Sequence, residues 1–282
     1  MPDVVASLGA LASLPGVPEK VEAARSACER LRFHEALRRR IPEASAESRV
    51  RGAQASAALE GATVPVDLVR DVMRGAGSWP REPDPVQHVA RGAVQATAET
   101  ERVRSLVTTA PLQALARLHV AAASGLVDDG QLGRPRTGEE TCAELTDLGP
   151  APAPADVAAR LAGLVDVLTA ATARGVPALV VAAVAHAEVC AVRPFARGNG
   201  VVARALERAV VQATGLDPTG VAVVEAGHAT QGGPAYLGAL AAYTMGSPEG
   251  LGLWLGHCAD ALVAAARAGE QVCDAVRTGR LA

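Results

Sequence analysis

The sequence predicts an all-α fold with one minor β element, and three observations lead to this prediction. Apolar residues make up 49% of the chain, and most of them are alanine, valine and leucine. Arginine is used almost to the exclusion of lysine, since Lys20 is the only lysine. Alanine, leucine and arginine favour helices, and apolar residues recur at helical spacing along most of the chain.

Length, net charge and cysteine content limit the classes to which this protein can belong. A chain of 282 residues is long enough for one large domain, or for a core domain with an extension. The net charge of −3 argues against a general nucleic-acid binder and against a membrane-surface protein. The five cysteines are far apart and form no CxxC pair, which predicts free thiols and a cytoplasmic protein. No charged-then-apolar leader opens the chain, so we expect no signal peptide.

The N-terminal third predicts four helices. The first covers residues 18–40, and the second runs from Ser45 to Glu60 with Gly61 as its C′ residue. A third helix ends at Gly75, and Asp84 caps a fourth that reaches about residue 107. We therefore expect an N-terminal helical region over residues 1–104.

The rest of the chain predicts more helices, broken by one irregular stretch. A helix follows Pro111, and the segment TCAELT at 141–146 is the best candidate for a short hairpin. Asp156 is expected to cap the next helix. The apolar run at 177–192 is too short and too polar to span a bilayer, so it predicts a central buried helix. Further helices are expected at 201–214, 232–245 and 249–275.

The stretch VRPFARGNGVVAR at 192–204 predicts an anion site. Arg193 precedes a proline, which favours extended backbone and should end the buried helix. Gly198 and Gly200 bracket Asn199, and all three residues tolerate positive φ. Because a helix begins at once, the turn exposes backbone N–H groups at the positive end of that helix. Arg193, Arg197 and Arg204 add positive charge nearby.

This stretch resembles the signature of the Fic (Fido) family, which reads His-x-Phe-x-Asp/Glu-Gly-Asn-Gly-Arg-x-x-Arg. Upstream, the helix around His119 and the sequence GRPR are similar to the family's LxxLHxxL helix and to the start of its substrate-binding flap. The resemblance covers about residues 105–245. The matching residues of the signature are Phe195, Gly198, Asn199, Gly200 and Arg204.

The resemblance implies a helical core around a central buried helix, a hairpin flap and transfer of AMP from ATP. In the family the motif histidine is the general base and the acidic residue holds magnesium. Here Arg193 replaces the base, and an arginine cannot accept a proton at neutral pH; losing a general base costs about 10²–10⁴ in rate. Arg197 replaces the metal ligand and disfavours magnesium, while Val201 removes one phosphate contact. His186 or His228 is the alternative base.

A second motif lies upstream of this core. The stretch QASAALEGA resembles the inhibitory signature Ser/Thr-x-x-x-Glu-Gly/Asn, with Ser56, Glu60 and Gly61 at the matching positions. In that class the glutamate bridges to the second motif arginine, which is Arg204 here. A carboxylate in the last turn of a helix loses about 0.3–1 kcal/mol to the helix dipole. A buried guanidinium would offset that cost.

The predicted organisation is an N-terminal region (1–104) that carries an inhibitory helix at about 45–61, a core (105–245) and a C-terminal helix packed on it (246–282). The expected function is that of a degenerate Fic-domain protein without AMP transfer. It would bind a nucleotide such as ATP, or another anion, at the Gly-Asn-Gly turn under control of a Glu60–Arg204 latch. The alternatives are a transferase with altered chemistry and a module for a protein partner or a homodimer, its cleft vestigial. No residues show metal-ligand spacing along the chain, and His119 and His186 are expected to be hydrogen-bonded core groups.

Overall fold

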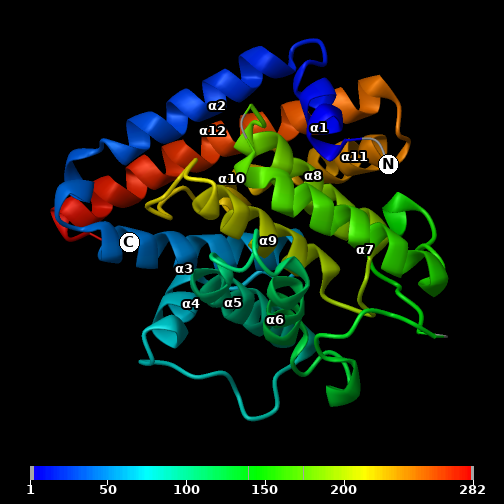
Figure 1. Ribbon diagram of the computed structural model, residues 1–282. Helices are drawn as coiled ribbons and strands as arrows, with labels where there is room; N and C mark the ends of the chain where they lie inside the picture. Colours follow the sequence, from blue (N-terminus) through cyan, green and yellow to red (C-terminus); the bar gives the residue numbers. More distant parts are fainter. Residues whose placement is uncertain (1–2, 139, 174, 281–282) are drawn as a thin grey trace.

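The computed structural model describes residues 3–138, 140–173 and 175–280, which form α-helices joined by turns and short 3₁₀ helices (Figure 1). The 3₁₀ helices are Glu35–Arg38, Asp129–Gln131, Thr146–Leu148 and Ala170–Thr172. The α-helices are α1 (Val4–Ala12), α2 (Val17–Arg32), α3 (Ile41–Leu59), α4 (Val66–Met73), α5 (Pro85–Val103), α6 (Pro111–Ala123), α7 (Pro154–Thr169), α8 (Ala178–Val192), α9 (Asn199–Ala213), α10 (Val224–Thr230), α11 (Gly233–Thr244) and α12 (Pro248–Thr278).

The centre of the molecule is the pair α8 and α9. Residues 179–192 of α8 are all buried except Glu188, and residues 199–212 of α9 are all buried. A helix that is apolar around its whole circumference must be enclosed by other elements, so the predicted central buried helix is confirmed in α8. The α8–α9 corner holds the Gly-Asn-Gly turn, which places that turn against the core.

The remaining helices surround this pair. The long helix α12 lies alongside α2 and also packs against α10 and α11 (Figure 1). Helix α3 contacts α5 and α10, and α5 in turn packs against α6 and α9. One continuous hydrophobic core includes residues from the segments 1–104, 105–245 and 246–282, so these three predicted regions pack together as one unit.

Several predicted helix ends are confirmed. Gly61, Gly75 and Gly215 have φ values of 81°, 75° and 77°, the left-handed geometry that a C′ glycine supplies. At the start of α5, the Asp84 carboxylate accepts from Gln87 N and the Gln87 side chain accepts from Asp84 N. This capping box satisfies N–H groups that the first helical turn leaves without partners.

Three helix predictions need correction. The expected helix 18–40 divides, because the His34 ring accepts a hydrogen bond from Ala36 N at 3.3 Å and starts a 3₁₀ turn. Helix α7 begins at Pro154, so Asp156 lies in its first turn and is not its cap. The helices α1 and α10 were not predicted. In α10, Gly227 is required because a Cβ there would lie 2.0 Å from the Ala261 carbonyl oxygen of α12.

The predicted hairpin is wrong. Within the described residues there is no β-strand, and the only β-type pairing is one isolated bridge between Ser124 and Val127. Arginine side chains take the place of a neighbouring strand, since they donate to the carbonyl groups of the segment 134–153. Arg136 Nη2 donates to Pro152 O at 3.1 Å, and Arg193 supplies further donors. We call this segment the flap loop.

The cysteines are unpaired, as the sequence predicts. All five cysteines are free thiols, and four of them are buried. Among the described helices, none is both long enough and apolar enough to cross a bilayer.

Candidate functional site

The turn between α8 and α9 begins with a strained residue. Arg193 ends α8 as predicted, but its φ of 45° and ψ of 63° are left-handed, whereas the sequence predicted extended backbone. A non-glycine residue in this region costs about 1–3 kcal/mol. The bonds that the Arg193 guanidinium forms can offset that cost.

The Arg193 side chain points into the flap loop and is only 2% exposed. Its Nη1 donates to Gly149 O at 2.8 Å, and its Nη2 donates to Pro150 O at 2.9 Å. Nη1 also lies 3.3 and 3.2 Å from the carbonyl oxygens of Glu144 and Leu145. All four of these side-chain hydrogen bonds of Arg193 thus go to flap-loop carbonyls. The structure thus directs the Arg193 guanidinium to the flap loop, and its part in anion binding stays a prediction.

The Gly-Asn-Gly turn does hold an anion, and the chain itself supplies it. Gly198 N donates to Glu144 Oε1 at 2.6 Å, and Asn199 N donates to Glu144 Oε2 at 3.0 Å. The Asn199 side-chain Nδ2 adds a third donor to Glu144 Oε2 at 3.1 Å. The carboxylate therefore occupies the amide groups at the positive end of α9, the place where the sequence predicts a phosphate.

Asn199 also fixes the shape of the turn. Phe195 N donates to Asn199 Oδ1 at 3.0 Å, and Asn199 Nδ2 donates to Phe195 O at 2.9 Å. Gly198 has a φ of 83°, a value that glycine adopts without cost. These features orient the Gly198 and Asn199 amides toward one point.

His119 of α6 packs against the turn. Its ring stacks on Phe195 with centroids 3.8 Å apart, and its Nε2 lies 3.1 Å from Arg197 O. Its Nδ1 accepts from Gly133 N at 2.8 Å, so both ring nitrogens have partners. Burial lowers the pKa of His119 to about 4, which keeps the ring neutral at neutral pH. The expected core role of His119 fits this geometry.

The predicted contact between Glu60 and Arg204 is present. Arg204 Nη2 lies 2.7 Å from Glu60 Oε1, and Arg204 is 1% exposed. Arg204 Nε donates to Ser56 Oγ at 3.0 Å, and Nη2 donates to Ser56 O at 3.1 Å. Ser56 and Glu60 of the upstream motif therefore bind the same guanidinium. Gly61 follows them with a left-handed backbone that ends α3.

Gly200 allows Glu60 to approach α9. A Cβ at position 200 would lie 2.2 Å from Glu60 Oε1, so any larger residue displaces that carboxylate. Two carboxylates thus meet at the start of α9, one from α3 and one from the flap loop. Burial raises the pKa of Glu144, and the charge of Glu60 raises it further against the opposing effect of the amide donors.

Arg197 is exposed. It lines a cavity of about 560 Å³ together with Asp128 and Glu144. The sequence placed three guanidinium groups around the turn. Among the described residues, the structure places Arg204 in contact with the Glu60 carboxylate, Arg197 in the lining of this cavity and Arg193 against the flap loop.

Glu144 is the site residue that sequence reasoning missed. It precedes Gly198 by 54 positions, and its only sequence signal is a place in the loop predicted as a hairpin. A carboxylate in an irregular loop opposite a glycine-rich turn is the pattern that would have drawn attention to it.

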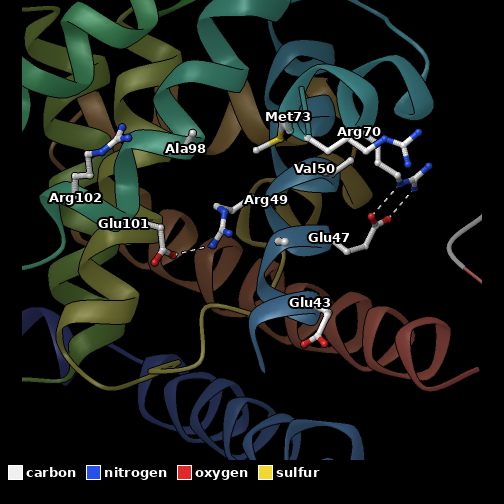
Figure 2. A pocket seen from close by; sticks show the side chains of 11 residues that line it. Glu43, Glu47, Arg49, Val50, Arg70, Met73, Ala98, Glu101 and Arg102 are labelled. Carbon is white, nitrogen blue, oxygen red and sulfur yellow. Dashed lines mark hydrogen bonds and ion pairs between the residues drawn. The ribbon is translucent and has the colours of Figure 1, made fainter. Parts of the chain in front are cut away.

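A second cavity lies apart from the turn, between α3, α4 and α5 (Figure 2). Its volume is about 520 Å³, and its floor includes Val50 and Met73. Its charged walls are neutralised in pairs, since Arg49 bonds Glu101 at 3.0 Å and Arg70 bonds Glu47 at 2.9 Å. This pocket therefore offers less unbalanced charge to a ligand than the turn does.

The all-α core, whose central helix ends in a Pro-Phe and Gly-Asn-Gly turn, is Fic-like in its fold. Residues 108–210 match the model of the Fic/DOC family. Among the curated proteins, none matches the chain significantly.

Solved structures of Fic proteins share the fold. Fic-1 (residues 134–508) from C. elegans aligns with a TM-score of 0.70 and 19% identity, over 93% of this chain and 73% of that one. A Fic family protein from Desulfovibrio desulfuricans aligns with a TM-score of 0.67 and 21% identity, over 95% and 76%. A Fic domain containing signaling protein from Bacteroides thetaiotaomicron gives 0.62 and 13%, over 90% and 98%. The alignments extend well beyond the segment 108–210, so the surrounding helices belong to the shared fold.

Proposed function

We propose that this protein binds a phosphate-bearing nucleotide, or a related anion, at the Gly-Asn-Gly turn and does not transfer AMP. The observation that carries the proposal is the carboxylate of Glu144 on the amides of Gly198 and Asn199. A turn that binds a carboxylate through two backbone N–H groups has the donors that a phosphate oxygen needs. Arg204, one turn further along α9, supplies the positive charge for a second phosphate group.

Two internal carboxylates keep this site closed. Glu60 occupies Arg204 and Glu144 occupies the amides, so a polyphosphate must displace both. The two carboxylates also repel one another, which lowers the cost of releasing the first. The upstream motif thus acts as a latch, as its resemblance to the inhibitory signature implies, and the flap loop acts as a second closure.

Among the described residues around the turn, we find no side chain placed to act as a general base. The base position holds Arg193, whose guanidinium is engaged by flap-loop carbonyls. The alternative bases are turned into the core. His186 bonds Glu207 and Tyr236, and His228 bonds Glu207 and His257. None of these groups reaches a hydroxyl in the cleft, which supports loss of transfer activity.

Magnesium does not fit the turn. Hard divalent ions take carboxylate and carbonyl oxygens as ligands, and position 197 offers a guanidinium instead. The Glu144 oxygens are already engaged by three N–H groups. We therefore expect anion binding that is independent of magnesium, and we assign no chemical step to the metal.

Isothermal titration calorimetry with ATP, ADP and AMP, each with and without magnesium, tests this proposal. The samples are the wild type, Glu60→Gly, Glu60→Gly/Glu144→Ala and the same double variant with Arg204→Ala. We expect binding to strengthen in that order up to the double variant and to be lost again with Arg204→Ala. Glu140→Ala, which removes a charge from the same loop without contacting the turn, is the matched control.

Two outcomes would overturn the proposal. One is a correctly folded double variant that gives no heat with any of the three nucleotides. The other is transfer of labelled AMP to protein in a cell lysate by the wild type, if the label disappears with Arg204→Ala.

A further inference from the structure

A group of polar side chains lies in the middle of the core, away from the turn. His186 Nδ1 of α8 lies 2.5 Å from Glu207 Oε2, and His228 Nε2 of α10 lies 2.7 Å from the same oxygen of α9. The potential ligand atoms of these three residues all lie within 4.8 Å of one another, and all three side chains are buried. Three separate helices thus bring two imidazoles and one carboxylate to a single point.

The Glu207 carboxylate is buried, and the two imidazoles are its hydrogen-bond partners. The neighbouring arginines of α9 are paired elsewhere, Arg204 with Glu60 and Arg208 with Glu225. Buried charges in proteins are paired or bind metal ions, because an isolated ion loses its hydration.

The outer nitrogens of both rings have partners that suit metal ligation. His186 Nε2 lies 2.7 Å from Tyr236 OH, and His228 Nδ1 lies 3.1 Å from His257 Nε2. A histidine that binds a metal through one nitrogen usually donates its other N–H to a neighbouring acceptor, which fixes the ring and its tautomer. The phenol oxygen and the neutral His257 ring are such acceptors.

We propose that His186 Nδ1, Glu207 Oε2 and His228 Nε2 bind a divalent first-row transition metal of the zinc type. Two imidazoles and a carboxylate are a recognised ligand set for Zn²⁺. Ligand atoms about 2.0–2.2 Å from a tetrahedral ion lie roughly 3.3 Å apart, so binding widens the present contacts by under about 1 Å. Because the site is closed by α8, α9 and α10, the metal has a structural role there.

Metal content of the purified full-length protein tests this site. We expect elemental analysis to find about one zinc or similar ion per chain in wild type, and well under half of that in His228→Gln. His119→Gln, which alters a buried histidine of α6 outside the group, should keep the metal. Metal retained in His228→Gln and lost in His119→Gln would overturn the assignment.

A second measurement decides the case if His228→Gln does not fold. Wild-type protein is stripped with a chelator and titrated with Zn²⁺ and with Co²⁺. We expect a saturable rise in melting temperature with Zn²⁺ and the visible absorption bands of tetrahedral Co²⁺. A stripped protein that shows neither response, and a freshly purified protein that contains no stoichiometric metal, would refute the proposal.

Discussion

Removing the carboxylate of Glu144 should open the Gly-Asn-Gly turn to external anions. The clearest comparison is Glu60→Gly against Glu60→Gly/Glu144→Ala, because the first change releases Arg204 and the second releases the amides. Sulfate is the best probe, since it stays doubly charged across the pH range in which Glu144 titrates. Any gain in affinity then reports the loss of an internal competitor.

The magnitude follows from the contacts. Glu144 accepts three hydrogen bonds, and each bond to a charged group contributes about 1.5–3 kcal/mol. Burial of the carboxylate opposes this gain, as its raised pKa shows. We take the difference between these two effects as about 2 kcal/mol in favour of the form in which Glu144 occupies the turn. The form with a free turn then makes up a few per cent of the protein. Removing Glu144 therefore strengthens sulfate binding about 30-fold.

The assay is a sulfate titration followed by calorimetry or by the melting temperature. We expect a tenfold to hundredfold gain in the double variant over Glu60→Gly, with Glu140→Ala unchanged as the control for charge loss in the same loop. Equal sulfate affinity in Glu60→Gly and in the double variant would refute the conclusion that Glu144 competes with ligands.

Three further predictions concern stability and the latch. Arg208→Ala leaves the fully buried Glu225 carboxylate without its two-pronged partner (2.9 and 2.7 Å), so urea denaturation should show a loss of about 3–5 kcal/mol; a loss below 1 kcal/mol would contradict this. Gly200→Ala should displace Glu60 and raise nucleotide affinity as Glu60→Gly does, whereas unchanged affinity would show that Glu60 does not close the site. The pKa of His119, near 4 in the folded state, lies below its value of about 6.5 in the unfolded chain, so the unfolded state takes up the proton first and stability falls as pH drops from 6.5 to 4. His119→Gln should remove up to about 3 kcal/mol of this pH-dependent loss in the free energy of unfolding, measured by denaturation at each pH. An unaltered pH profile would contradict the lowered pKa of His119.

The helices and the contact of Glu60 with Arg204 were predictable because their signals are local or have a recognisable spacing. Gly61 and Gly75 end helices through their own backbone freedom, and Asp84 caps a helix through a residue three positions away. The contact of Glu60 with Arg204 spans 144 positions. It was predicted only because both ends match motifs of one resemblance.

The errors share one physical cause, which is competition from distant groups. Arg193 should be extended before Pro194, but bonds from its side chain to the flap loop favour a left-handed backbone. The same bonds satisfy carbonyls that a hairpin partner would otherwise satisfy. The residues next to Arg193 and those next to the flap loop give no sequence signal that these two segments bond to each other.

Two features of the sites depend wholly on the fold. Glu144 reaches the turn because the flap loop folds back on α9, and the sequence around it only suggested a short strand. His186, Glu207 and His228 show no metal-like spacing along the chain, and three helices bring them together. Clusters of this kind become visible only when the packing of the helices is known.

The most direct test of the central claim is an NMR titration of Glu60→Gly/Glu144→Ala with ATP, following the backbone amides of the turn. The proposal predicts that the Gly198 and Asn199 N–H signals move together and saturably, and that the Arg204 Nε–H signal moves with them. Binding whose shifts fall on other surfaces while these three signals stay still would contradict it.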